Sequence, residues 1–274
     1  MDSTKMTTEV EGLKKKLRAT WMAGDFAEIA KSFESGAADF VARLGLKPGA
    51  SVLDVAYGNG NTALPAALLG AEVTGVDIAP YVIEQAVERV AAAGARAEFD
   101  VGDAEDLPYE DASFDAVMTM FGAMFAPRPD VVAHQLKRVC RPGGLIAMAN
   151  WTPEGFVGQM FKTTGKYVPP PAGMPSPLQW GIEETVAKRF ADGISDLQMV
   201  RRDIDFVFPV GPVEVVEQFR RYYGPTQKAF EALDPNGQSS LRKDLEELWG
   251  GFNSATDGTT KVASEYLEIR ATRS

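Results

Sequence analysis

The spacing of apolar residues changes character at residue 48. Before it, apolar positions recur at helical intervals, and Gly24 and Asp25 interrupt the run. Beyond it, short apolar runs alternate with helical stretches. The predicted strands are 51–56, 71–76, 96–101, 114–120 and 145–151, and the predicted helices between them are 62–69, 80–93 and 129–139. Such alternation predicts right-handed βαβ units in a parallel sheet covered on both faces.

The alternation stops after Trp151. Residues 152–200 are rich in proline and are expected to form an irregular insertion. Further strands are predicted at 199–208 and 261–271, with helices at 212–233 and 239–249 between them. The predicted fold class is therefore α/β, a doubly wound Rossmann-like sheet of seven strands, mostly parallel, with an antiparallel last strand and helical lid segments.

We expect one domain over residues 1–274, because no linker separates the tail from the rest. Within it, residues 1–47 form an N-terminal helical lid and residues 48–151 the ligand-binding core. Residues 152–200 form a lid insertion, since they leave the carboxyl edge of the sheet, where ligands bind in such folds. Residues 201–274 complete the sheet.

Charge and composition exclude several classes of function. The formal net charge of −10 disfavours nucleic acids and anionic membrane surfaces as partners. One cysteine excludes an internal disulfide, and one cysteine with one histidine cannot build a zinc site from soft ligands. Residues 1–10 lack the apolar core of a signal peptide, and no run is long enough for a membrane helix. We expect a cytoplasmic protein without a metal.

A glycine-rich turn carries the first sign of a ligand. Gly58 and Gly60 lie between a predicted strand and a predicted helix, where glycine allows a ligand to approach the backbone. Asp77 ends the next strand, and a carboxylate there can accept hydrogen bonds from ribose hydroxyls. Together they predict an adenosine-containing ligand. The turn also fits the dinucleotide fingerprint G-x-G-x-x-A, so an NAD-dependent oxidoreductase remains an alternative.

Three further segments decide between these alternatives. They are Val52-Leu53-Asp54-Val55-Ala56-Tyr57-Gly58-Asn59-Gly60, then Gly102-Asp103-Ala104-Glu105-Asp106-Leu107-Pro108-Tyr109 with Ser113-Phe114-Asp115, then Leu136-Lys137-Arg138-Val139-Cys140-Arg141-Pro142-Gly143-Gly144. In order and spacing they resemble the class I S-adenosylmethionine-dependent methyltransferases, in particular the small-molecule branch similar to the ubiquinone and menaquinone methyltransferases. The resemblance is strong over about residues 48–151.

The resemblance implies S-adenosyl-L-methionine as cofactor, with S-adenosyl-L-homocysteine as product, and a role for each matching position. Asp54, Ala56, Gly58 and Gly60 would line the methionine and ribose end. The remaining implied contacts are Asp77 with the ribose hydroxyls, Ile78 with one face of the adenine, Gly102, Asp103 and Ala104 with the adenine edge, and Phe121 beside the cofactor.

Two positions depart from the family pattern. Ala56 stands where the family has its first glycine, and Tyr57 stands where it usually has cysteine. A side chain at either position could alter the site. A second alternative is therefore an enzyme of this fold that binds S-adenosylmethionine but catalyses another reaction, such as a cyclisation.

The implied reaction is methyl transfer to an O, N or C atom of a small, apolar or aromatic metabolite. Because the sulfonium already activates the methyl group, positioning and desolvation supply much of the acceleration. An acceptor of high pKa needs a base in addition, for which Asp25 and Tyr222 are candidates. Aromatic residues that follow the fourth and fifth predicted strands, such as Phe121 and Trp151, could line an acceptor pocket. The sequence does not specify the acceptor or the oligomeric state.

Overall fold

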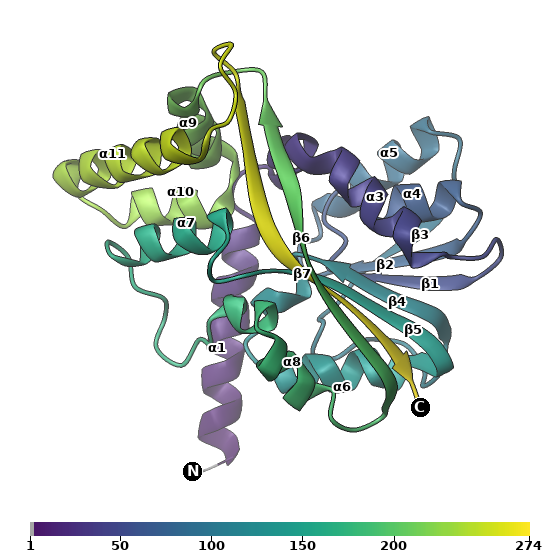
Figure 1. Ribbon diagram of the computed structural model, residues 1–274. Helices are drawn as coiled ribbons and strands as arrows, with labels where there is room; N and C mark the ends of the chain where they lie inside the picture. The colour runs from purple at the N-terminus through teal and green to yellow at the C-terminus, as the bar shows by residue number, and fades with distance from the viewer. Residues whose placement is uncertain (1–2) are drawn as a thin grey trace. The chain divides into compact units, whose positions relative to one another are not determined.

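The central sheet has seven strands, in the order β3-β2-β1-β4-β5-β7-β6 (Figure 1). The computed structural model describes residues 3–274, so residues 1–2 of the predicted N-terminal segment lie outside the described residues. The strands are β1 (Ser51–Val55), β2 (Glu72–Asp77), β3 (Ala97–Val101), β4 (Phe114–Met120), β5 (Cys140–Trp151), β6 (Ile194–Phe208) and β7 (Thr260–Arg273). The ladders joining β3, β2, β1, β4 and β5 are parallel, whereas β7 is antiparallel to β5. The predicted fold class is confirmed.

By its contacts the chain forms two compact units. The first, called here the helical unit, contains Met1–Phe33, Pro153–Ser176 and Asp203–Glu265, and the second, the sheet unit, contains Glu34–Thr152, Pro177–Arg202 and Tyr266–Ser274. The two segments predicted as lids are thus divided between the units. Whether they close over a ligand stays a prediction.

In the sheet unit, helices cover both faces of the parallel strands. They are α3 (Glu34–Leu44), α4 (Ala63–Leu68), α5 (Val82–Ala92), α6 (Pro129–Val139) and α8 (Glu183–Arg189). Figure 1 shows α3, α4 and α5 on one side of the sheet and α6 on the other. Strands buried on both faces need near-continuous apolar sequence, and four of the five residues of β1 are fully buried. That burial leaves the strand ends as the places where polar groups can collect.

The helical unit is built around aromatic side chains. Its helices are α1 (Ser3–Trp21), α2 (Phe26–Ala30), α7 (Phe156–Gly165), α9 (Pro212–Tyr222), α10 (Gly224–Glu231) and α11 (Pro235–Phe252). The Trp249 ring lies 4.4 Å from that of Phe156 and 5.1 Å from that of Phe219, centroid to centroid. Aromatic pairs at this spacing add to the stability gained from burial. These residues therefore form the core of this unit.

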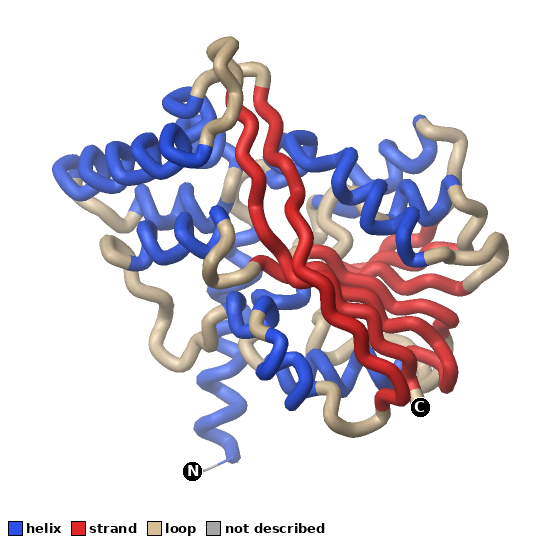
Figure 2. Tube along the Cα trace, in the orientation of Figure 1, coloured by secondary structure: helices blue, strands red, loops and turns tan. Residues whose placement is uncertain are grey.

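Three sequence predictions need correction. Residues 152–200 are not irregular, since they contain α7 and α8, and the prolines at 169–171 follow the end of α7. The helix predicted over 212–233 is two helices, because Tyr223 adopts an extended conformation and pairs with Gly24. Strand β6 begins at Ile194, before the predicted start, and runs beside β7 (Figure 2).

Candidate active site

The turn after β1 is held in an unusual backbone conformation. Ala56, Gly58 and Gly60 have φ angles of 59°, 56° and 81°. Glycine adopts such angles freely, but Ala56 does so at a cost, because its Cβ crowds the backbone. The Ala56 N–H donates to the Val76 carbonyl over 2.7 Å, which ties the turn to β2. The turn thus keeps a left-handed backbone at residue 56 although that residue is alanine.

A second close approach brings the ends of β1 and β4 together. Gly122 follows Phe121, and a Cβ on Gly122 would lie 2.5 Å from the Ala56 Cβ. No side chain fits in that space, so a glycine is needed at 122. Sequence reasoning missed Gly122, because its role depends on a contact with a residue far away in the chain.

Asp77 joins the turn to the end of β2. Its Oδ2 accepts a hydrogen bond from the Gly58 N–H over 3.0 Å, and its Oδ1 accepts one from the Ala79 N–H over 2.9 Å. Each carboxylate oxygen keeps a further lone pair for another donor. Burial raises the pKa of Asp77, and the backbone hydrogen bonds oppose that rise. The structure therefore places the two residues of the predicted nucleoside site, Gly58 and Asp77, in contact.

Asp54 is the most unusual ionisable group of this edge. Its side chain is fully buried, and its Oδ2 accepts a hydrogen bond from the Thr62 hydroxyl over 2.6 Å. Its Oδ1 has no hydrogen-bond partner among residues 3–274. Burial, and then the nearby Asp77, raise the pKa of Asp54 to about 7. A hydrogen-bond donor or a cation at Oδ1 would stabilise the ionised form of the Asp54 carboxylate.

Two more orphaned polar atoms lie within five residues of Asp54. The Asn59 Oδ1 and the Tyr57 hydroxyl are buried and have no hydrogen-bond partner within the described part of the chain. The Tyr57 ring packs against Phe99 with centroids 4.7 Å apart, and a Cβ on Gly75 would lie 2.7 Å from Tyr57. Tyr57 is therefore a packing residue over β2 and β3. Buried polar atoms without partners are rare, and the Oδ1 atoms of Asp54, near the end of β1, and of Asn59, in the turn after it, therefore indicate a place for a polar ligand.

The segment that begins at Gly102 lies beside Asp77. The Gly102 N–H donates to the Asp77 carbonyl over 2.9 Å, and the Asp103 Oδ1 accepts from the Glu105 N–H over 2.8 Å. Asp103, Ala104 and the nearby Ile78 are all half-buried. This loop is also tied to the segment after β4, because the buried Glu105 forms an ion pair with Arg128 over 2.7 Å. Glu105 belongs to a motif that the sequence shows, but no sequence pattern indicates a role for its partner Arg128.

Phe121 lies where β4 ends, with a left-handed backbone and a buried ring. The ring stacks on Trp151 with centroids 3.5 Å apart and meets Tyr266 edge-on at 5.5 Å. The structure thus brings Asp54, Asp77, Gly102 and Phe121 to the carboxyl ends of neighbouring parallel strands. In open α/β sheets this edge is where ligands bind.

The two candidate bases belong to the helical unit. Asp25 caps the N-terminus of α2, where its Oδ1 accepts from the Ala27 N–H over 3.1 Å. Its own N–H donates to the Tyr222 carbonyl over 3.0 Å, so Asp25 and Tyr222 are neighbours. Asp25 therefore already has a structural role, and a catalytic role for either residue stays a prediction.

Metal-binding clusters and membrane-spanning helices are both absent from the described residues. Within residues 3–274 no cluster of three or more His, Cys, Asp or Glu side chains could hold a metal ion. No helix in the same span has the length and apolar character needed to cross a membrane.

Comparisons with known proteins agree on the family. Residues 52–144 match a family model described as a methyltransferase domain. An uncharacterized protein of Mycobacterium tuberculosis is 39% identical over 235 residues, which are 84% of this chain and 86% of that protein. This chain belongs to the class I S-adenosylmethionine-dependent methyltransferase family.

Two further proteins are similar to this chain. The 2-methyl-6-phytyl-1,4-hydroquinone methyltransferase of Synechocystis is 35% identical over 131 residues, 45% of this chain and 41% of that enzyme. The structure of phosphoethanolamine N-methyltransferase 2 from Haemonchus contortus, solved with S-adenosyl-L-methionine, is similar with a TM-score of 0.55 and 21% identity. That alignment covers 88% of this methyltransferase and 53% of the Haemonchus chain, and it shows a shared fold.

Proposed function

We propose that this methyltransferase transfers a methyl group from S-adenosyl-L-methionine to an O, N or C atom of a small, apolar or aromatic metabolite. One observation carries the proposal most directly. The Oδ1 atoms of Asp54 and Asn59 are buried acceptors without partners in the described chain, near the end of β1 and in the turn whose Gly58 N–H meets Asp77. A ligand with amino and hydroxyl donors would complete these hydrogen bonds.

The residues present fit this cofactor. The Asp54 carboxylate and the Asn59 carbonyl oxygen both accept hydrogen bonds and donate none. The cofactor carries an amino group and ribose hydroxyls, which are donors, and a cationic sulfonium that would lower the cost of an ionised Asp54. The left-handed turn at Ala56, Gly58 and Gly60 leaves the backbone open to a ligand.

Each residue of the edge has a proposed part. Asp54, Ala56, Gly58 and Gly60 hold the methionine and ribose end, and Asp77 orients the ribose hydroxyls. Ile78, Gly102, Asp103 and Ala104 hold the adenine, and Phe121 lies beside the cofactor. When bound, S-adenosyl-L-methionine supplies an electrophilic methyl group on a positively charged sulfur. The protein's own contribution is to orient, to desolvate and to exclude water.

On the acceptor side we propose an apolar pocket and a closing movement. Residues 15–35 and the 152–200 segment would cover the bound substrates, and Asp25 or Tyr222 would take a proton where the acceptor needs it. The protein is proposed to act in the cytoplasm on a small molecule, without metal, nucleic acid or membrane as partner.

Methyl transfer is favoured over the two alternatives. An NAD-dependent oxidoreductase does not explain the family match over residues 52–144. A reaction other than methylation would use the same cofactor edge, and the departures at Ala56 and Tyr57 motivate it. Both residues, however, are accommodated without blocking the turn, since Tyr57 is buried over β2 and β3.

The decisive assay uses S-adenosyl-L-methionine with a deuterated methyl group and an extract of the producing cells. We expect mass spectrometry to find a small molecule that gains the label with wild-type protein and gains far less with Asp77→Asn. Release of S-adenosyl-L-homocysteine should match the gain. A product that forms only with cofactor present, but gains no label, would contradict methyl transfer and indicate the other reaction.

A further inference from the structure

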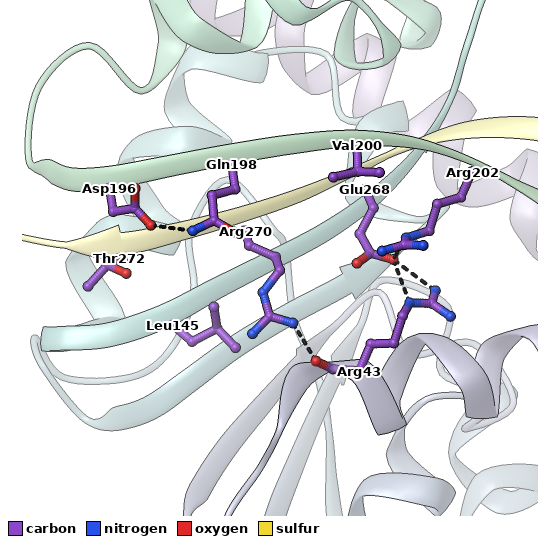
Figure 3. Close-up of a pocket in the computed structure, with 9 residues that line it drawn as sticks. All are labelled: Arg43, Leu145, Asp196, Gln198, Val200, Arg202, Glu268, Arg270 and Thr272. Atoms are coloured by element: carbon purple, nitrogen blue, oxygen red, sulfur yellow. Dashed lines mark hydrogen bonds and ion pairs between the residues drawn. The ribbon is translucent and has the colours of Figure 1, made fainter.

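A pocket lies in the sheet unit, and its lining differs from the proposed cofactor edge. Its volume is about 470 Å³, which is within the range of small-molecule sites. It is lined by Arg43, Leu145, Asp196, Gln198, Val200, Arg202, Glu268, Arg270 and Thr272 (Figure 3). None of these residues belongs to the proposed cofactor site. We call this region the arginine pocket.

Strand alternation explains which side chains line it. Residues 196, 198, 200 and 202 of β6 share one face, as do residues 268, 270 and 272 of β7. Leu145 pairs with Thr272 and marks the start of the regular part of β5, so the pocket extends along the sheet toward the end opposite Asp54 and Asp77. Arg43 comes from the last turn of α3.

The pocket is built around one buried carboxylate. The Glu268 side chain is 2% exposed, and its Oε2 accepts hydrogen bonds from Nε and Nη2 of Arg43 over 3.0 and 2.8 Å. Arg202 forms an ion pair with the same oxygen, Nε to Oε2, over 2.9 Å. Arg270 donates to the carbonyls of Arg43 and Leu44 and so caps the end of α3.

These contacts leave donors unused. A guanidinium has five N–H groups, and Arg43 also uses Nη2 to donate to the Tyr266 hydroxyl over 2.7 Å. Within residues 3–274, Nη1 of Arg43 and both Nη atoms of Arg202 meet no protein acceptor. Both side chains are about one-third exposed, so these donors reach the pocket space.

The charge of the lining is positive in a chain whose net charge is −10. Three arginines face two carboxylates, and one of these, Asp196, accepts a hydrogen bond from the Gln198 amide over 2.8 Å. Leu145 and Val200 add apolar wall next to the arginines. Guanidinium groups with free N–H pairs match the planar or tetrahedral oxygens of carboxylates and phosphates.

We propose that the arginine pocket binds a small organic anion, with a carboxylate or phosphate group on Arg43 and Arg202 and an apolar body against Leu145 and Val200. Glu268 holds the two guanidinium groups in place for the ligand. The site is separate from the proposed cofactor edge, and the proposal does not depend on the reaction catalysed there.

Calorimetry on the full chain tests this with four probes: hexanoate, hexyl phosphate, inorganic phosphate and hexylammonium. We expect hexanoate or hexyl phosphate to bind, and the tighter of the two identifies the head group. Inorganic phosphate should bind more weakly because it lacks the apolar body, and hexylammonium should not bind. If neither organic anion binds at millimolar concentration, or if hexylammonium binds as tightly, the proposal is overturned.

One variant and a matched control locate the site. Arg202→Gln should weaken binding of the organic anion by about tenfold or more, since a charged partner is lost. Arg201→Gln is the control, because Arg201 is the neighbouring residue of β6 and pairs with Glu183 over 2.7 Å. It should leave binding unchanged. Equal affinity in the two variants would contradict the assignment.

A third variant tests the site without removing an ion pair, so that a loss of binding is not confused with a loss of folding. Val200 is 45% exposed and takes no part in the ion pairs, so Val200→Phe should fill the pocket without disturbing Glu268. We expect Val200→Phe to lose binding of the organic anion while its melting temperature stays close to that of the wild type. Retained affinity in this variant would place the ligand elsewhere.

Discussion

Two buried carboxylates in the sheet unit have opposite surroundings. Glu268 has two arginines on one oxygen, whereas Asp54 has a hydroxyl on one oxygen and no partner in the described chain on the other. The arginine pocket has N–H donors that meet no protein acceptor. The proposed cofactor edge has buried oxygen acceptors that meet no protein donor. The unpartnered Asp54 oxygen is buried and costs stability, whereas the spare arginine donors belong to side chains that are about one-third exposed. In both regions the spare groups indicate the chemistry of a ligand that would fit. An anion suits the first region, and a cation with hydrogen-bond donors suits the second.

The largest expected effect is on the stability of the arginine pocket. Arg43→Met removes two hydrogen bonds from the buried Glu268 and one from Tyr266. Arg202 stays paired with Glu268 in this variant, but its Nε makes no hydrogen bond there, so Glu268 loses both of its hydrogen bonds from guanidinium groups. We expect a loss of about 3 kcal/mol in the free energy of unfolding. Urea denaturation measures it.

Arg202→Met is the matched comparison. Arg43 still pairs with Glu268 in this variant, so the expected loss is about 1 kcal/mol. Equal losses of stability in the two variants would mean that Glu268 depends on Arg43 and Arg202 alike. Arg202 would then be less available to bind a ligand than we infer.

The next effect concerns affinity at the cofactor edge. Asp77→Ala should weaken binding of S-adenosyl-L-homocysteine by about 1.5–3 kcal/mol, since charge-assisted hydrogen bonds are lost. Asp77 also accepts from the backbone N–H groups of Gly58 and Ala79, so some stability is lost as well. Calorimetry and thermal melting separate the two effects. Unchanged affinity with a large fall in melting temperature would make Asp77 a purely structural residue.

A smaller effect, of opposite sign on stability, is expected at Asp54. The folded pKa of about 7 lies above the unfolded value, so the folded state binds the extra proton and loses stability as pH rises toward 7. Asp54→Asn removes this loss. We expect the variant to be more stable than the wild type by about 1–2 kcal/mol at pH 8, but to bind S-adenosyl-L-homocysteine more weakly.

Denaturation at several pH values checks the sign. The advantage of Asp54→Asn should grow between about pH 5 and 7 and level off above, because Asp54 is then ionised throughout. An advantage that is the same at pH 5 and pH 8 would mean that the Asp54 carboxyl is not responsible.

The sequence predicted which residues meet at the strand ends better than it predicted the rest of the molecule, for a physical reason. Gly58, Asp77 and Asp103 follow strands whose ends must meet at one edge of a parallel sheet, so their proximity follows from strand order. Glu268 and Arg43 carry no such signal, because their pairing depends on how far α3 and β7 extend. Gly122 and Arg128 were missed for the same reason, since only a tertiary contact explains them.

Boundaries were predicted well only where local chemistry marks them. Pro129 and Pro212 begin α6 and α9 as predicted, because proline is favoured in the first turn of a helix. The start of α11 was missed, since it begins at Pro235 behind the Asp234 cap and not at residue 239. The break at Tyr223 was missed although Gly224 and Pro225 directly follow it and Pro225 lies in the first turn of α10. The pairing of Tyr223 with Gly24, far away in the chain, could not be predicted from the local pattern.

The smallest effect concerns the proposed lid. Hydrogen exchange of residues 15–35 should slow when S-adenosyl-L-homocysteine binds, if α1 and α2 close over the ligand. The control is the α11 helix, whose buried Leu241, Leu245 and Trp249 anchor it in the helical unit. Its exchange should not change. Unchanged exchange over residues 15–35 would rule out the lid.

The central claim is that the edge formed by Asp54, Gly58 and Asp77 binds S-adenosyl-L-methionine. Calorimetry on the purified protein with S-adenosyl-L-homocysteine and with NAD tests it most directly. We expect micromolar-scale binding of S-adenosyl-L-homocysteine and none of NAD. Tight binding of NAD, with no binding of S-adenosyl-L-homocysteine, would contradict the account.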